Sequence, residues 1–145
     1  IEPFARKVVA FEPDSTHFIC LQRNCTINCD PRQEAVGSES KNISLTKDDF
    51  TQAKRIDKEG TIRMVTLDSF NFTDVDLIKI DVEGYEMQVI KGAEDTLKTT
   101  QYLMIELNNN TKKYGSNNIE VEKYIGSLGF KVLMDHWPDK VFYRS

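Results

Sequence analysis

The stretch VDLIKIDVEGYE, residues 75–86, decides the fold that we expect for this chain. Residues 77–80 are apolar except for Lys79, and they form a short run with the length and composition of a buried strand. Asp81 follows this run directly, and a glycine and a helical pattern come after it. A buried strand that leads through a short turn into a helix is the repeating unit of α/β proteins, so this stretch predicts that class.

The same alternation extends in both directions from this stretch. We expect strands at Lys7–Phe11, Glu34–Ser38, Lys41–Leu45, Thr61–Leu67, Asp76–Ile80, Leu103–Leu107, Phe130–Met134 and Val141–Tyr143. We expect helices from Asp14 or Ser15, from near Gly84 to Gly92, and from Asn118 to Gly129, with a polar helix or loop between Leu45 and Thr61. This order predicts a mainly parallel sheet with helices on both faces, closed by an antiparallel hairpin that turns at His136–Lys140.

Composition restricts the class of protein and its partners. The 145 residues are 39% hydrophobic and 29% charged, which is typical of a single globular domain spanning 1–145. The net charge is −4 and no basic stripe occurs, so nucleic acid is not an expected partner. No apolar stretch approaches the roughly 20 residues of a membrane span, so no membrane partner is expected either.

The cysteines indicate a compartment and the absence of a metal site. Cys20, Cys25 and Cys29 form an odd set, which suggests free thiols in a reducing compartment, and we therefore expect the cytoplasm. His17 lies nearby, but the spacing of these residues matches no zinc pattern, so we expect no metal.

Acidic residues stand at the ends of three expected strands. Glu12 follows the run Val8–Phe11, Asp81 follows residues 77–80, and Glu106 lies in the run Leu103–Leu107. Because ligands of parallel α/β sheets bind at the carboxyl ends of strands, these acids are candidates for one pocket. A carboxylate can accept hydrogen bonds from both hydroxyls of a ribose, and Glu12 is the candidate for that role. The alternative is that such acids are solvated or cap the next helix.

The stretch around residues 75–86 resembles the hallmark of FkbM-type methyltransferases, and so does its extension, Val89-Ile90-Lys91-Gly92-Ala93. Upstream, Val9-Ala10-Phe11-Glu12-Pro13 is similar to the family's second strand, and Val65-Thr66-Leu67-Asp68 is similar to the segment before the hallmark. Met104-Ile105-Glu106 resembles the following strand and its acid. The resemblance covers most of the chain.

The resemblance implies a Rossmann-like class I methyltransferase sheet that binds S-adenosylmethionine. In such a fold Glu12, with Pro13 beside it, would hold the ribose of the cofactor, and Val36 and Gly37 would lie near its adenine. Asp81 would lie beside the methyl-transfer pocket and contribute to the cofactor site.

The resemblance also suggests residues for the chemistry. Asp81 or Glu83 is the candidate general base or electrostatic partner of the sulfonium, and these two are our candidate catalytic residues. Glu106 and His136 are the candidate substrate-binding residues, although His136 could equally be a plain turn residue. The expected acceptor is a hydroxyl group of a sugar, glycan or small metabolite.

The chain departs from the family pattern at its start. The family's first strand and its glycine-rich cofactor loop have no counterpart, and because a βαβ unit has about 30 residues, we expect that about 20–30 residues of the core are absent. We therefore interpret the chain as an N-terminally truncated methyltransferase. An unpaired central strand edge would favour self-association, so a homodimer is expected.

The departure keeps a second function open. A chain that lacks the cofactor loop could be a non-catalytic remnant or a binding module. A nicotinamide-binding protein would also carry a strand-end acid, but no Gly-x-Gly-x-x-Gly motif occurs in the chain.

Overall fold

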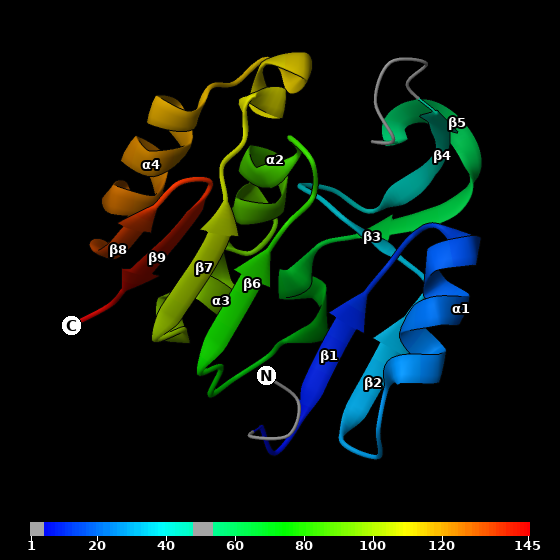
Figure 1. The fold of residues 1–145 in the computed structure, drawn as a ribbon, viewed down its shortest axis with the longest axis horizontal. Helices are drawn as coiled ribbons and strands as arrows, with labels where there is room; N and C mark the ends of the chain where they lie inside the picture. Colours follow the sequence, from blue (N-terminus) through cyan, green and yellow to red (C-terminus); the bar gives the residue numbers. More distant parts are fainter. Residues whose placement is uncertain (1–4, 48–53) are drawn as a thin grey trace. The chain divides into compact units, whose positions relative to one another are not determined.

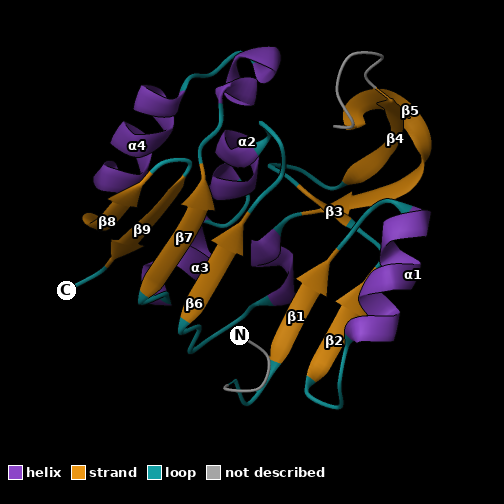
Figure 2. Cartoon of the chain, viewed as in Figure 1, coloured by secondary structure: helices purple, strands orange, loops and turns teal. Residues whose placement is uncertain are grey.

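The computed structural model describes residues 5–47 and 54–145 and has an α/β fold (Figures 1 and 2). The chain divides into two compact units. The first comprises Ile1–Val36 and Ser40–Val65, and the second comprises Gly37–Glu39 and Thr66–Ser145. The expectation of one domain over 1–145 stays a prediction.

The first unit begins with a strand, a helix and a second strand. β1 (Val8–Phe11) pairs in parallel with β2 (Cys29–Arg32), and α1 (Ser15–Asn24) connects them. Asp14 caps α1 because its carboxylate accepts hydrogen bonds from the backbone N–H groups of Thr16 and His17. The expected strand and helix are confirmed, whereas β2 was not predicted. Its sequence, Cys-Asp-Pro-Arg, lacks the apolar alternation of a strand, and pairing with β1 makes it extended.

A second sheet of the same unit has the order β3-β5-β4. β3 (Ala35–Val36) is parallel to β5 (Lys54–Val65), and β4 (Lys41–Lys47) is antiparallel to it. β5 is longer than expected, because the predicted polar helix or loop is a strand from Lys54 onward, where backbone pairing with β4 overrides the polar sequence. The earlier part of that prediction, residues 48–53, lies outside the described residues.

The second unit contains a four-stranded sheet with the order β6-β7-β9-β8 (Figure 1). β6 (Leu77–Ile80) and β7 (Tyr102–Glu106) are parallel, while β9 (Asp139–Tyr143) is antiparallel to both β7 and β8 (Lys131–His136). The terminal hairpin is therefore confirmed. The described strands form three hydrogen-bonded sheets, one parallel (β1-β2) and two of mixed direction, and not one mainly parallel sheet.

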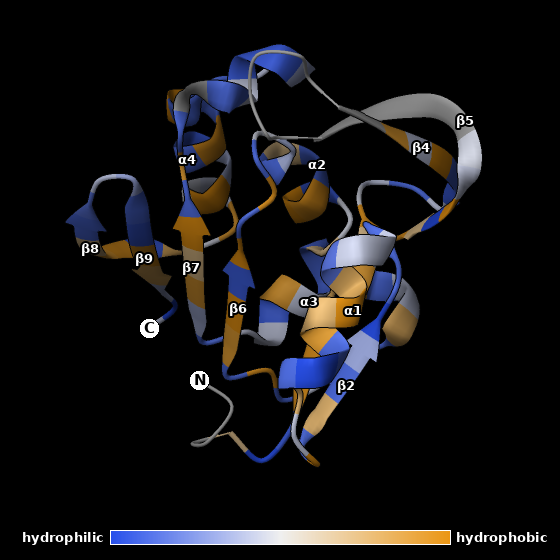
Figure 3. Ribbon diagram, turned by 45° about the vertical axis from the view of Figure 1, so that its right-hand side comes forward, coloured by the Kyte–Doolittle hydropathy of each residue, from blue (hydrophilic) through white to orange (hydrophobic). Residues whose placement is uncertain are grey.

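Helices and the sheet of the second unit share one apolar core. The helical elements are η2 (Leu67–Phe70), α2 (Glu86–Lys91), α3 (Glu94–Thr99), η3 (Asn109–Tyr114) and α4 (Asn118–Ser127). Figure 3 shows the apolar residues along β7, a central strand of this sheet. The core residues buried in this unit are Leu67, Ile80, Val89, Ile90, Ala93, Leu97, Leu103, Ile105, Leu107, Val121, Ile125, Phe130 and Phe142.

Capping residues define the ends of α4. The N-cap is Asn117 and not Asn118 as predicted, and Asn117 forms a reciprocal capping box with Glu120. The side chain of Asn118 instead accepts a hydrogen bond from the Thr111 hydroxyl at 2.9 Å and donates to the Leu107 carbonyl oxygen at 3.2 Å. Asn118 therefore connects the start of α4 to the segment that follows β7.

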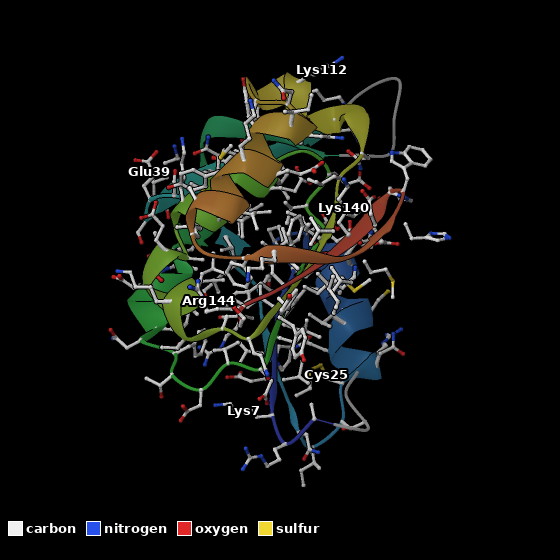
Figure 4. All side chains as sticks on the ribbon, turned by 90° about the vertical axis from the view of Figure 1, so that its left-hand side faces the viewer. Lys7, Cys25, Glu39, Lys112, Lys140 and Arg144 are labelled. Carbon is white, nitrogen blue, oxygen red and sulfur yellow. A yellow bond between two sulfur atoms is a disulfide. The ribbon has the colours of Figure 1, made fainter. Side chains whose placement is uncertain are left out.

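The cysteines differ from the expectation of free thiols. Cys25 and Cys29 form a disulfide between the end of α1 and the start of β2, and Cys20 is free and exposed (Figure 4). The helix end and the parallel strand place the two residues side by side, which spacing alone did not reveal. Within the described residues, we find no helix whose length and apolar character would suffice to cross a membrane.

Candidate functional site

Acids gather at the carboxyl ends of β6 and β7. Ile80 and Ile105 are paired in parallel register, so Asp81 and Glu106 leave neighbouring strands at the same edge. Asp139 is paired with Glu106 from the other side. Burial raises the pKa of the Glu106 carboxyl above its usual range, and the negative charges of Asp81, Asp139 and Glu83 raise it further. The second unit thus brings Asp81 and Glu106 to one edge, as the sequence predicted, with Glu83 in the turn that follows. Glu12, the third acid expected at this edge, belongs to the first unit, so its place in the same pocket stays a prediction.

Asp81 is held by the lysine of its own strand. The Lys79 Nζ lies 2.9 Å from the Asp81 Oδ2, and the two side chains are 41% and 40% exposed. Lys79, the one charged residue in the apolar run of β6, is thus paired with an acid. The cation keeps one oxygen of Asp81 in a fixed place at the strand end, and the exposure leaves the side chain accessible to a ligand.

The turn after Asp81 has an unusual backbone. Glu83 has φ 54° and Gly84 has φ 112°, both in the left-handed region. A side chain on Gly84 would place its Cβ 2.5 Å from the carbonyl oxygen of Asn110, so only glycine allows the segment after β7 to come this close. The glycine of the hallmark is therefore required by a close approach between the two loops as well as by its φ.

Glu83 contacts the same segment through its carboxylate. Its Oε2 accepts hydrogen bonds from the Nδ2 of Asn108 at 3.1 Å and from the Nδ2 of Asn110 at 3.0 Å. The sequence analysis did not identify these asparagines. The signal that could have found them is the run Asn108–Asn110 directly after a buried strand, at the edge where ligands bind.

Glu86 is a buried acid that the sequence analysis also missed. Its side chain is fully buried, and its Oε1 accepts a hydrogen bond from the Gly84 N–H at 2.8 Å. Its Oε2 is buried without a hydrogen-bond partner among the described residues. Burial raises the pKa of the Glu86 carboxyl, and the negative charges of Glu83 and Asp81 add to the effect. Glu86 thus stabilises the turn through its buried hydrogen bond with the Gly84 N–H.

His136 lies at the tip of the terminal hairpin. It ends β8, is exposed, and is paired in register with Asp139, which is itself paired with Glu106. The hairpin is tethered to the acidic edge because the Leu107 N–H donates to the Pro138 carbonyl oxygen at 2.8 Å. His136 is therefore separated from Glu106 by one strand.

The first unit places Glu12 at the carboxyl end of β1. The Glu12 N–H donates to the Arg32 carbonyl oxygen at 3.0 Å, which continues the pairing of β1 with β2. Its Oε1 accepts the Asp14 N–H at 2.7 Å, so the half-buried side chain is fixed over the turn that leads into α1. Pro13 lies within this turn and is half buried. His17 on α1 is 64% exposed, and its Nδ1 lies 3.9 Å from the Asp14 Oδ1.

Val36 and Gly37 lie where the chain passes from one unit to the other. Val36 belongs to β3 and is paired with Val65, so it lies in a different sheet from Glu12. Gly37 belongs to the second unit, where its carbonyl oxygen faces Gly92. Just before β3, Glu34 forms an ion pair with Arg63 at 3.1 Å.

Comparisons with known proteins agree with this description. The family model described as the methyltransferase FkbM domain matches residues 4–132. A crystal structure of the methyltransferase FkbM from Methylobacillus flagellatus KT superposes with a TM-score of 0.65 and 18% identity, covering 95% of this chain and 36% of that one. The chain therefore spans about a third of the length of that protein. No curated protein matches the sequence significantly.

Proposed function

Because this chain belongs to the FkbM methyltransferase domain family, we propose that it takes part in S-adenosylmethionine-dependent methyl transfer to a hydroxyl group of a sugar, glycan or small metabolite. The observation that carries the proposal is the group of acids at the ends of β6 and β7, where Asp81 is exposed and anchored by Lys79. The similarity to the solved methyltransferase supports the fold of the class I enzymes.

The residues of the first unit fit the ribose of this cofactor. Glu12 ends a parallel strand, and the Asp14 N–H occupies only one of the roughly four acceptor positions of a carboxylate. Hydroxyl groups that approach the strand end can therefore donate to it. We assign Glu12 and Pro13 to the ribose, and Val36 and Gly37 to the adenine side of the cofactor.

The residues of the second unit fit proton removal and orientation of the acceptor. When bound, S-adenosylmethionine supplies an electrophilic methyl group on a sulfonium. Asp81 would accept the proton of the acceptor hydroxyl, a role that contributes roughly 10²–10⁴-fold to a rate. Glu106, whose raised pKa favours the protonated form more than usual, would contact the acceptor, and we assign His136 to the outer side of the same site. Orientation alone can contribute about 7–11 kcal/mol in favourable cases.

The second candidate function is a non-catalytic remnant or binding module. The experiment that separates the two is calorimetric titration of S-adenosylhomocysteine into the purified chain, with Glu12→Ala as the site variant and Gln22→Ala as an exposed control on α1. We expect saturable binding that Glu12→Ala weakens by about tenfold or more, equivalent to ~1.4 kcal/mol, and that Gln22→Ala leaves unchanged.

The outcomes of this titration have different meanings. Binding that is equal in both variants would remove Glu12 from the ribose role. An absence of binding, together with an absence of methyl transfer by a longer protein that contains this chain, would favour the non-catalytic function.

We also propose that the chain forms a homodimer. Analytical ultracentrifugation of the same purified chain tests this proposal.

A further inference from the structure

Three consecutive residues of the β6–α2 turn contact the η3 segment. The Glu83 carboxylate accepts from the side-chain amides of Asn108 and Asn110, and Gly84 lies against the Asn110 backbone. The rings of Tyr85 and Tyr114 meet edge to face with centroids 4.9 Å apart. The two loops that follow β6 and β7 are therefore joined along their length.

The far side of η3 is anchored independently of Glu83. Thr111 is almost fully buried, and its hydroxyl donates to the Asn118 side chain at the start of α4. The Asn108 side chain also accepts a hydrogen bond from the Asn110 N–H at 3.0 Å, so Asn108 is the N-cap of η3. Removal of the Glu83 carboxylate would thus release one side of η3 without unfolding α4.

The hydrogen bonds engage one oxygen of Glu83 with η3. Both amides donate to the same oxygen, Oε2, so this oxygen is already occupied by the η3 segment. Asp81 lies two residues earlier and is bound by a lysine through one oxygen, and its side chain is 40% exposed at the strand end. Glu83 is therefore bound to the η3 segment, whereas Asp81 is exposed at the strand end.

We propose, on the basis of the methyltransferase function proposed above, that Glu83 is a positioning residue: it holds η3 against the β6–α2 turn and so forms the acceptor-side wall beside Asp81. Asp81 is then the acid that meets the reacting hydroxyl. Asn108 and Asn110 contribute to this positioning because both donate to the Glu83 carboxylate, and the Asn108 side chain also hydrogen-bonds the Glu106 carboxyl.

Glutamine and alanine at position 83 separate positioning from base catalysis. Glu83→Gln keeps an oxygen that can accept from both asparagines but cannot take up a proton, whereas Glu83→Ala loses both properties. If Glu83 positions η3, Glu83→Gln keeps methyl transfer within about threefold, because a charge-assisted hydrogen bond is only about twice as strong as a neutral one. Glu83→Ala lowers kcat/KM by about 10²-fold, the effect expected of a misplaced loop.

The pH profile gives a second distinction. A general base determines the acidic limb of the kcat/KM profile. The limb persists in Glu83→Gln if Asp81 is the base, and it disappears in Glu83→Gln if Glu83 is the base. Loss of the limb together with a loss of activity as large as in Glu83→Ala would overturn the proposal.

A measurement without turnover tests the positioning itself. Lys112 and Lys113 lie within η3, and Figure 4 labels the exposed Lys112. Limited digestion with trypsin should cleave there faster in Glu83→Ala, Asn108→Ala and Asn110→Ala, and at the original rate in Glu83→Gln. Asp95→Ala is the control for cleavage at Lys112 and Lys113, because it removes a 75% exposed acid of α3 whose ion-pair partner is Lys98, outside η3.

These readouts keep the two proposals distinguishable. Faster cleavage in the alanine variants without methyl transfer by any variant would support the positioning and contradict the methyltransferase function. Unchanged cleavage in Glu83→Ala would overturn the positioning whatever the activity.

Discussion

Gly92 lies so close to Gly37 that a Cβ atom on Gly92 would be 1.9 Å from the Gly37 carbonyl oxygen. The sequence predicted that Gly92 ends the helix, as glycines often do, and α2 does end at Lys91. The φ of Gly92, however, is −88°, which any residue can adopt. The glycine is required because the backbone of residues 37–39 packs against the end of α2.

Gly92→Ala should therefore destabilise the second unit. The backbone would have to move to relieve the clash, and overpacking of this kind costs about 1–3 kcal/mol or more. We expect a lower midpoint of thermal unfolding, measured by circular dichroism. Gly126→Ala is the matched control, because a Cβ at Gly126 in α4 meets nothing within 4 Å, and alanine should stabilise the helix by roughly 0.5–1 kcal/mol. An equal effect of the two substitutions would contradict the packing argument.

The sequence predicted elements well where the chain follows its local pattern. β1, α1, β6 and the terminal hairpin each have apolar residues at regular spacing and a capping or turn residue at an end. β2 and the first half of β5 have polar sequences that become strands only because a neighbouring strand pairs with them, and that pairing is not visible in a local pattern.

Glu86 should make stability depend on pH. Its buried carboxyl has a raised pKa in the folded protein, so over the range between its ordinary value of 4.5 and the higher folded value the native state binds more protons than the unfolded state. The contribution of the Glu86 carboxyl to the free energy of unfolding is therefore fully present below pH 4.5, and it is lost as the pH rises through the pKa of the folded state. Each unit of pKa difference corresponds to about 1.4 kcal/mol.

Glu86→Gln removes this dependence, because the amide oxygen can still accept the Gly84 N–H and no proton is lost. Urea unfolding at pH 5 and pH 8 should show a smaller fall in the free energy of unfolding for the variant than for the original chain. A fall of the same size in both proteins would mean that the Glu86 carboxyl does not have a raised pKa.

The disulfide predicts the number of reactive thiols. After unfolding without reductant, a thiol reagent should modify Cys20 alone, and reduction should release two further groups. Loss of a crosslink over so short a loop should cost about 2 kcal/mol, which Cys25→Ser measures by urea unfolding. Modification of all three thiols without reduction would contradict the pairing.

The disulfide also bears on the compartment that we expected. A disulfide that forms in the cell would count against the cytoplasm, because reducing compartments keep thiols reduced.

The candidate site was only partly predictable, because some of its contacts join segments that are far apart in the sequence. Asp81 and Glu106 are strand-end acids, and parallel pairing of β6 with β7 brings them to one edge, as the sequence indicated, whereas the place of Glu12 in the same pocket stays a prediction. The roles of Asn108 and Asn110 depend on how the loop after β7 folds back onto the turn after β6, and that contact joins residues about 25 positions apart. No local pattern contains such information.

The chemical role of Asp81 can be tested by a substitution that preserves its shape. Asp81→Asn keeps the size of the side chain and a polar contact with Lys79, but it cannot accept the proton of a hydroxyl. If Asp81 is the base, kcat should fall by roughly 10²–10⁴-fold with little change in the affinity for S-adenosylhomocysteine, measured by single-turnover methyl transfer and calorimetry.

Lys79→Met provides the control for this substitution. It removes the cation that holds Asp81 but leaves the carboxylate, and because exposed ion pairs contribute only about 0–1 kcal/mol, the loss in kcat should be about fivefold at most. If Asp81→Asn and Lys79→Met lower kcat equally, the ion pair as a unit and not the basicity of Asp81 supports the reaction. A kcat unchanged in Asp81→Asn would remove Asp81 from the chemistry and leave Glu106, the neighbouring acid with a raised pKa, as the residue to test next.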